Sequence, residues 1–205
     1  DAQYNLGNMY YYGEGVEKDS KKAFEWYEKA ASQGDEKAET TISAIKGDAN
    51  AQYELGDMYY YGEGYYYGEG VKQDYKKAFE WYEKAASQGL AIAQFSLGLM
   101  YDKGEGVKKD IKKAFEWYEK AASQGLAEAQ FSLGFMYYDR IGVKKDIKKA
   151  IECFEKAASQ GFADAQYILG IMYDVGEGVK KDIKKAKKLF KEACNGGHQD
   201  SCKLI

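Results

Sequence analysis

The sequence predicts an all-α fold, a right-handed α/α superhelical solenoid of helix-turn-helix repeats, on three observations. A period of 36 residues runs through the chain, since Ala93, Ala129 and Ala165 hold equivalent positions. The composition has the bias that copying one pattern produces, with 23 glycines, 20 tyrosines and no proline in 205 residues. Each copy contains a short apolar stretch, a Gly-rich loop and a longer amphipathic stretch, which we interpret as helix A, a loop and helix B.

Helix A has a glycine in its interior in every copy, although a glycine inside a helix costs about 1 kcal/mol relative to alanine. These glycines are Gly7, Gly56, Gly98, Gly134 and Gly170. Because this loss of helix stability recurs in every copy, we expect each glycine to provide a compensating benefit. That benefit is expected to be the close approach of helix B. The side chains expected to pack on the glycines are Trp26, Trp81 and Trp117.

Helix B begins after an aspartate, whose carboxylate can accept hydrogen bonds from the free N–H groups of the first turn. The capping aspartates are Asp19, Asp74, Asp110, Asp146 and Asp182. In the copy at 93–128, an apolar stripe at i, i+3, i+4 and i+7 follows the cap, formed by Ala114, Trp117, Tyr118 and Ala121. Glycines that can adopt the left-handed conformation end the helix at Gly34, Gly89, Gly125, Gly161 and Gly197.

Because a two-helix unit cannot bury its apolar faces alone, we expect the units to stack into a single solenoid domain over residues 1–205. The predicted units are 2–37, 51–92, 93–128, 129–164 and 165–200, followed by a truncated tail. An irregular stub at 38–50 is expected to form one isolated helix or an irregular link. The element YYYGEG occurs twice in tandem from Tyr59 to Gly70, so we expect a disturbed superhelix near residues 35–75. It stays open whether both irregularities are natural or arise from missing segments.

The recurring residues resemble the Sel1-like repeat, a relative of the tetratricopeptide repeat. The motif consists of Ala-x-x-x-Leu-Gly-x-x-Tyr, then Gly-x-Gly-Val-x-x-Asp, then Lys-Lys-Ala-x-x-Trp-Tyr-x-Lys-Ala-Ala-x-x-Gly, and covers nearly the whole chain. Family members often have a proline between the loop valine and the helix B aspartate. This sequence departs from that pattern at Glu17, Lys72, Lys108, Lys144 and Lys180, which predicts less rigid loops.

The C-terminus is similar to a cysteine-rich, secreted bacterial branch of the same family. That resemblance implies a disulfide between Cys194 and Cys202, which are eight residues apart, and with it a periplasmic or secreted location. Two reduced cysteines in a packed tail are the alternative, and without the bridge the compartment is unknown. Cys153 replaces the helix B tryptophan in its own unit, so we interpret it as a buried core thiol.

Composition disfavours several classes of function. With 30 basic and 33 acidic residues the net charge is −3, so the excess positive charge of a nucleic-acid binder is missing. No apolar run approaches the roughly 20 residues that span a bilayer, so membrane insertion is not expected. One histidine and three scattered cysteines offer no metal-ligand spacing, and we expect neither a metal nor another cofactor. His198 is expected to be a solvated loop residue, so no catalytic set is assigned.

The resemblance implies one enzymatic alternative, because the cysteine-rich branch is associated with penicillin binding and β-lactamase activity. Ser43 and Lys46 fit the Ser-x-x-Lys pattern, in which the lysine could deprotonate the serine. The Ser-Asp-Asn and Lys-Thr-Gly elements that accompany this pattern are absent from the sequence. We therefore interpret the match as a coincidence and keep β-lactam hydrolysis only as the alternative function.

The expected binding surface is the concave wall of the solenoid, which helix A lines. The resemblance to tetratricopeptide packing leaves three positions of each helix A on this wall. The first is always aromatic (Tyr4, Tyr53, Phe95, Phe131 and Tyr167) and suits a core role as well as binding. The second and third are the candidate ligand-binding residues: Asn8 and Tyr11, Asp57 and Tyr60, Leu99 and Asp102, Phe135 and Tyr138, and Ile171 and Asp174.

These residues predict a groove that is polar and tyrosine-rich towards the N-terminus and apolar towards the C-terminus. Tyrosine and phenylalanine bury a large area with few rotatable bonds, so they serve well as anchors for a peptide. We therefore predict a non-enzymatic adaptor or scaffold that binds a protein or peptide. Homo-oligomerisation through exposed solenoid ends stays open.

Overall fold

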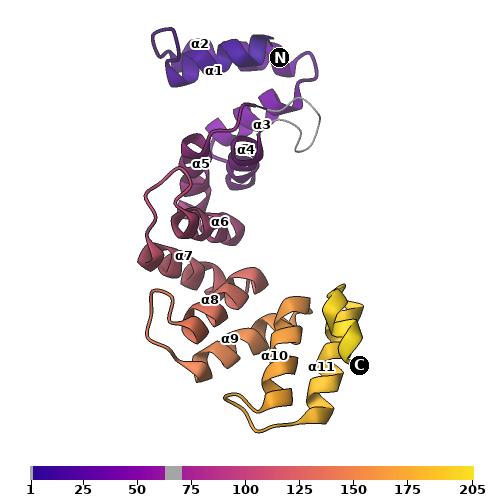
Figure 1. Ribbon diagram of the computed structural model, residues 1–205. Helices are drawn as coiled ribbons and strands as arrows, with labels where there is room; N and C mark the ends of the chain where they lie inside the picture. Colours follow the sequence, from indigo (N-terminus) through magenta and orange to yellow (C-terminus); the bar gives the residue numbers. More distant parts are fainter. Residues whose placement is uncertain (1, 63–70) are drawn as a thin grey trace. The chain divides into compact units, whose positions relative to one another are not determined.

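The computed structural model describes residues 2–62 and 71–205, in which helices joined by short loops follow one another along the chain (Figure 1). The predicted fold class, an all-α solenoid of helix-turn-helix repeats, is confirmed for these residues. The helices are α1 (Ala2–Tyr12), α2 (Ser20–Ala31), α3 (Glu36–Ile45), α4 (Ala49–Tyr61), α5 (Tyr75–Ser87), α6 (Ala91–Lys103), α7 (Ile111–Ser123), α8 (Ala127–Asp139), α9 (Ile147–Ser159), α10 (Ala163–Val175), α11 (Ile183–Asn195) and the 3-10 helix η1 (Gln199–Leu204).

The chain divides into two compact units. The first comprises Asp1–Ala93 with Glu105–Val107, and the second comprises Gln94–Gly104 with Lys108–Ile205. In the second unit, α8 packs on α9 and α10 on α11, and one core cluster is formed by Ala150, Ile151, Phe154, Leu169, Met172 and Leu189. The domain prediction, a single solenoid domain with the stated repeat bounds, stays a prediction.

The predicted starts and ends of helix B are confirmed. The carboxylate of Asp110 accepts hydrogen bonds from the backbone N–H groups of Lys112 and Lys113, both at 3.1 Å. The four other predicted aspartates cap their helices in the same way. The predicted terminal glycines all have positive φ, with Gly125 at 94° and Gly161 at 84°.

The helix A glycines lie against an aromatic side chain of helix B, but not against the tryptophans that we expected. A Cβ on Gly98 would collide with the ring of Tyr118, the residue after the tryptophan. The same holds for the pairs Gly7 with Tyr27, Gly56 with Tyr82, Gly134 with Phe154 and Gly170 with Phe190. The prediction of a close approach was right, and its assignment to the tryptophans was wrong.

The tryptophans instead hold a lysine one turn further along helix B. The ammonium groups of Lys29, Lys84 and Lys120 lie 4.1, 3.5 and 3.8 Å from the ring centroids of their tryptophans, a geometry in which the cation is attracted to the ring. Cys153 occupies the same position in its repeat but is only partly buried. Burial still raises the pKa of its thiol. The expected buried core thiol is therefore half-exposed.

The stub forms one helix, the first of the two predicted alternatives. The Asp35 carboxylate caps it by accepting from the Ala38 N–H at 3.1 Å. Its C-terminal end has the hydrogen bonds of a helix B end, since the Ala44 carbonyl accepts from the side-chain amide of Gln52 at 3.0 Å. In the second unit the carbonyl of Ala122 accepts in the same way from Gln130 at 3.3 Å. Most of the YYYGEG duplication, residues 63–70, lies outside the described residues.

A ladder of glutamine side chains joins the two helices of a repeat, and its bonds to backbone carbonyls reach the preceding repeat. The Gln160 amide donates to the Gln130 side-chain oxygen at 2.9 Å and to the Gly125 carbonyl at 2.8 Å. Gln88 donates to Gln52, and Gln124 to Gln94, both at 2.8 Å. The ladder ends at Gln166, because Gly196 stands at the position equivalent to Gln160. In the described part of the chain, the Gln166 Oε1 atom is buried and has no hydrogen-bond partner.

Candidate binding surface

In three repeats the second position of helix A contacts the aromatic residue of helix B within the same repeat. In the first unit it is polar and accepts a hydrogen bond from a tyrosine: Tyr27 donates to Asn8 at 2.8 Å, and Tyr82 donates to Asp57 at 2.5 Å. Asp57 is only 7% exposed, which corrects the expectation that it faces a groove. Burial raises the pKa of its carboxyl, while the hydrogen bond from Tyr82 acts in the opposite direction.

In the second unit the second position is apolar. The Phe135 ring packs edge-on against that of Phe154 at a centroid distance of 5.4 Å. Leu99 and Ile171 are half-buried, and the helix B aromatics of their repeats are Tyr118 and Phe190. The variation from asparagine to isoleucine therefore follows the helix B aromatic residue in four of the five repeats: a polar residue occurs with tyrosine, and an apolar residue occurs with phenylalanine. Leu99, whose repeat has Tyr118 in helix B, departs from this rule.

The third position makes contacts beyond its own helix hairpin. The Tyr60 hydroxyl donates to the Glu105 carboxylate at 2.6 Å. The Tyr138 hydroxyl contacts both carboxylate oxygens of Glu177 at 2.9 Å, and this hydrogen bond raises the pKa of Tyr138. Two predicted site residues are therefore bound to the glutamate of a Gly-Glu-Gly loop. The spacing of 39 residues between Tyr138 and Glu177 is visible in the sequence and could have suggested the pair.

The remaining third-position residues differ from one another. Tyr11 stacks on the indole ring of Trp81, with centroids 6.0 Å apart. Asp102 lies 3.9 Å from the ammonium group of Lys109, and its side chain is 45% exposed. Asp174 is half-buried. Asp102 and Asp174 therefore place carboxylates on the same helices as Leu99 and Ile171, three residues further along.

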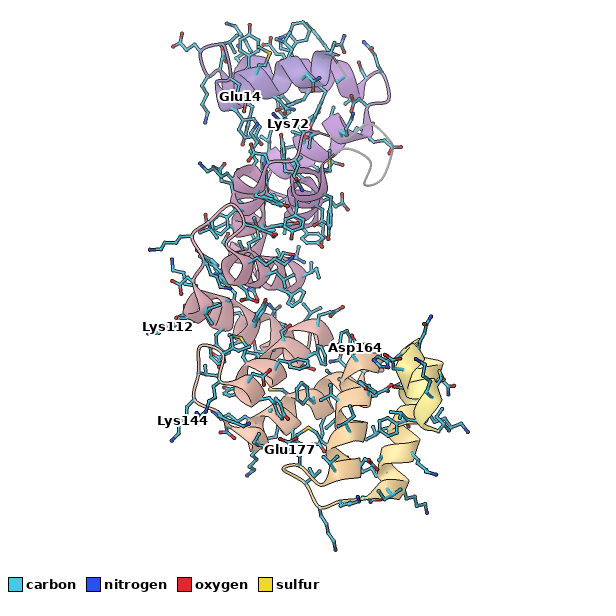
Figure 2. All side chains as sticks on the ribbon, in the orientation of Figure 1. Glu14, Lys72, Lys112, Lys144, Asp164 and Glu177 are labelled. Atoms are coloured by element: carbon cyan, nitrogen blue, oxygen red, sulfur yellow. A yellow bond between two sulfur atoms is a disulfide. The ribbon has the colours of Figure 1, made fainter. Side chains whose placement is uncertain are left out.

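The C-terminal histidine is packed rather than solvated, which corrects our expectation. The side chain of His198 is 19% exposed, and its ring stacks on that of Tyr167 with centroids 4.1 Å apart. The Nδ1 atom accepts a hydrogen bond from the backbone N–H of Ser201 at 3.2 Å and lies 2.9 Å from the Ser201 hydroxyl. The Nε2 atom lies 3.9 Å from the Asp164 carboxylate, which Figure 2 shows near η1.

Asp164, His198 and Ser201 have the residue types of a hydrolase triad, but their geometry is that of a helix cap. Ser201 is completely buried, so no substrate can reach its hydroxyl in this conformation. Nδ1 already accepts the backbone N–H, which is the role of a capping side chain. In the Ser-x-x-Lys match that we interpreted as a coincidence, Lys46 is exposed, and its ammonium lies 5.5 Å from the Phe24 ring centroid.

Cys194 and Cys202 form a disulfide that joins the end of α11 to η1, with their Cα atoms 4.9 Å apart. The bond therefore closes the segment that contains His198 and Ser201, and it holds η1 against α11 (Figure 1). No described helix is long and apolar enough to cross a membrane. Among the same residues, no three histidine, cysteine or acidic side chains are grouped as metal ligands would be.

A model of the Sel1 repeat family matches residues 1–35, 49–90, 91–126, 127–162 and 163–198. The chain belongs to the Sel1 repeat family. The helix α3 lies between the first two matches, so the stub is not matched by the Sel1 repeat model.

Three solved structures resemble this Sel1 repeat chain. A Sel1 repeat protein from Oxalobacter formigenes is 33% identical, with a TM-score of 0.72 over 97% of this chain and 52% of that one. The protective antigen c5321 of uropathogenic Escherichia coli is 33% identical, with a TM-score of 0.70 over 98% and 46%. Cysteine rich protein B of Helicobacter pylori is 31% identical, with a TM-score of 0.53 over 65% and 96%. The chain thus spans about half the length of the first two.

Proposed function

We propose that this Sel1 repeat protein is a non-enzymatic adaptor that binds a protein or peptide along helix A of its second unit. Sel1 repeats generally serve as protein-interaction scaffolds, which supports the class of function. The observation that favours this surface is the half-buried line of Leu99, Phe135 and Ile171, with the carboxylates of Asp102 and Asp174 beside it. Half-buried side chains are fixed by packing on one side and can contact a ligand on the other.

The chemistry of this line defines the partner. Apolar anchors of a peptide would contact Leu99 and Ile171, and basic groups would be attracted to Asp102 and Asp174. Phe135 supports the line from beneath, because its ring packs on Phe131 and Phe154. In the first unit, Asn8 and Asp57 are already occupied by tyrosine hydroxyls, so we assign the binding role to the second unit.

Selection of a displayed random-peptide library on the purified protein tests this proposal. We expect the selected peptides to be rich in apolar and basic residues, and to lose binding to the variant Asp102→Lys/Asp174→Lys. The matched control is Glu116→Lys/Glu152→Lys, which makes the same change of charge at exposed positions of helix B. If the selected peptides bound both variants equally, or if no sequence were enriched, the helix A surface would not be the binding site.

We further propose that the protein works in an oxidising compartment, periplasmic or extracellular. The disulfide between Cys194 and Cys202 supports this location, because such bonds are rare in reducing cytosol. Thiol counting on protein isolated from its own compartment under alkylating conditions tests the location. One reactive thiol, Cys153, is expected, and three thiols would place the protein in a reducing compartment. Homo-oligomerisation stays a prediction.

A further inference from the structure

An open pocket of about 530 Å³ lies in the second unit, on the side of the repeats where the loops precede helix B. Phe115 of α7 and Tyr137 of α8 line it together with Val143, Lys144, Lys145, Asp146 and Lys149. We call it the α9 loop pocket. Figure 2 shows Lys144 projecting from this loop. None of its residues belongs to the candidate helix A line, so this is a second surface.

The floor of the α9 loop pocket is aromatic. The rings of Phe115 and Tyr137 meet edge-on with centroids 5.6 Å apart. The Lys149 ammonium lies 5.1 Å from the Tyr137 ring centroid. Tyr173 is the equivalent tyrosine of the following repeat, and its hydroxyl accepts a hydrogen bond from the Lys185 ammonium at 2.6 Å. The pocket thus offers an apolar floor with a positive charge at its edge.

Two lysines of the pocket, Lys145 and Lys149, lack the acidic partner that an equivalent lysine has in one other repeat. Lys77, equivalent to Lys149, pairs with Glu14 at 2.6 Å, and Lys109, equivalent to Lys145, lies 3.9 Å from Asp102. Within residues 2–62 and 71–205, neither Lys149 nor Lys145 forms an ion pair, and the same is true of Lys144.

Two replacements remove acidic side chains from the repeat that contains the pocket. Ile141 stands where the loops of the neighbouring repeats have Glu105 and Glu177, and its side chain is 40% exposed. Tyr138 stands where the preceding repeat has Asp102. The one carboxylate of the pocket, Asp146, already accepts the backbone N–H of its helix at 3.0 Å. A ligand that supplies carboxylates would therefore give the pocket lysines acidic partners like those that Lys77 and Lys109 have within the chain.

We propose that the α9 loop pocket binds an acidic peptide segment that carries one aromatic side chain. The aromatic ring would pack on Phe115 and Tyr137, and the flanking carboxylates would meet Lys144 and Lys149. The chemistry favours a peptide over a nucleic acid, because the net charge of −3 repels a polyanion beyond the pocket itself. Exposed charge pairs bind weakly, so a dissociation constant on the order of 100 µM is expected.

NMR titration of the ¹⁵N-labelled full chain with the peptide acetyl-Glu-Glu-Phe-Glu-Glu-amide tests the proposal. Saturable shifts are expected at the backbone amides of Tyr137, Val143 and Lys149. Raising the salt from about 50 to about 200 mM should weaken binding several-fold, because the lysines are exposed. A peptide with alanine in place of phenylalanine, and one with lysines in place of glutamates, should each bind at least about tenfold more weakly.

The variant Lys144→Glu/Lys149→Glu should weaken the peptide at least about tenfold. Its matched control is Lys108→Glu/Lys113→Glu, which changes equivalent lysines of the preceding repeat by the same charge and should leave binding unchanged. Ile141→Glu should also weaken binding, since it restores the loop carboxylate of the neighbouring repeats. Equal loss in both lysine variants, tighter binding of an oligonucleotide, or no saturation up to about 5 mM peptide would each overturn the proposal.

Discussion

Replacing Gly196 by glutamine should extend the glutamine ladder by one step and stabilise the C-terminal repeat. The new amide would reach Gln166 Oε1, the buried acceptor that has no partner among the described residues. Gly196 has φ −79° and ψ 3°, which any residue adopts. An added Cβ would lie 3.0 Å from the Ala163 Cβ. The ladder already contains the same alanine–glutamine spacing of 33 residues at Ala127 and Gln160, so this contact can be accommodated.

The expected gain combines three effects. Satisfying a buried acceptor contributes about 1–3 kcal/mol. Losing the freedom of a glycine in the unfolded chain contributes about 0.4–1 kcal/mol. Ordering the glutamine side chain and the tight contact with Ala163 oppose these contributions by about 1.5–2 kcal/mol. The net stabilisation of Gly196→Gln should be about 1 kcal/mol, which corresponds to a rise in Tm of about 2–4 °C for a chain of this size.

Thermal unfolding followed by circular dichroism measures this gain, and hydrogen exchange of the α11 amides locates it. Gly196→Ala is the control, because it adds the Cβ without the amide. In a Gln166→Met background the acceptor is missing, so the advantage of glutamine over alanine at 196 should vanish. If Gly196→Gln were no more stable than Gly196→Ala, or if its advantage survived in the Gln166→Met background, the hydrogen-bond argument would be refuted.

Three further predictions concern stability. Gly134→Ala should cost about 2–4 kcal/mol in urea unfolding, because its Cβ would collide with the Phe154 ring. Asp57→Asn should raise stability at neutral pH and reduce its pH dependence, measured by urea unfolding across pH. The pKa of the Asp57 carboxyl is raised in the folded state, so wild-type stability is present at low pH and falls as pH rises above the ordinary value of 3.8. Removing the disulfide by Cys194→Ser/Cys202→Ser should cost about 2.5 kcal/mol by loop entropy and accelerate hydrogen exchange in η1.

Matched variants serve as controls for these three. Gly161→Ala changes a glycine with nothing within 4 Å of its added Cβ, so it should show only the strain of its positive φ. Asn8→Asp introduces a carboxyl at the position equivalent to Asp57, and should create the pH dependence that Asp57→Asn removes. Cys153→Ser removes a thiol that forms no disulfide and should leave hydrogen exchange in η1 unchanged. If a control variant had the effect expected of its test variant, or the test variant had none, the prediction for that pair would be contradicted.

The repeat architecture was predictable because its signals are local. An aspartate before helix B can cap the free N–H groups of its first turn, and a glycine after it can adopt the positive φ that ends the helix. Asp110 and Gly125 do so, as expected. The partner of the helix A glycine was not predictable to the residue. Trp117 and Tyr118 both belong to the apolar stripe, and spacing alone does not say which of two adjacent side chains faces helix A.

The candidate site was harder to predict, because it depends on contacts between residues far apart in sequence. Asp57 looks like a variable surface position until Tyr82, 25 residues later, is seen to donate to it. Likewise, nothing near His198 in the sequence indicates that its ring stacks on Tyr167. The excess charge of the α9 loop pocket is visible in the sequence as Ile141 in place of a loop glutamate, once the repeats are compared position by position.

The helix α3 shows how Sel1 arrays can change length by half a repeat. The end of α3 offers the same backbone acceptors as the end of a complete helix B. The Ala44 carbonyl accepts from the side-chain amide of Gln52, and the Gly47 carbonyl accepts from Gln88 at 3.0 Å. The hydrogen bonds between α3 and the following repeat therefore require only the end of one helix and not a complete helical hairpin. Duplication or deletion of a single helix can preserve these hydrogen bonds, so gene rearrangements within such arrays need not keep the repeat period.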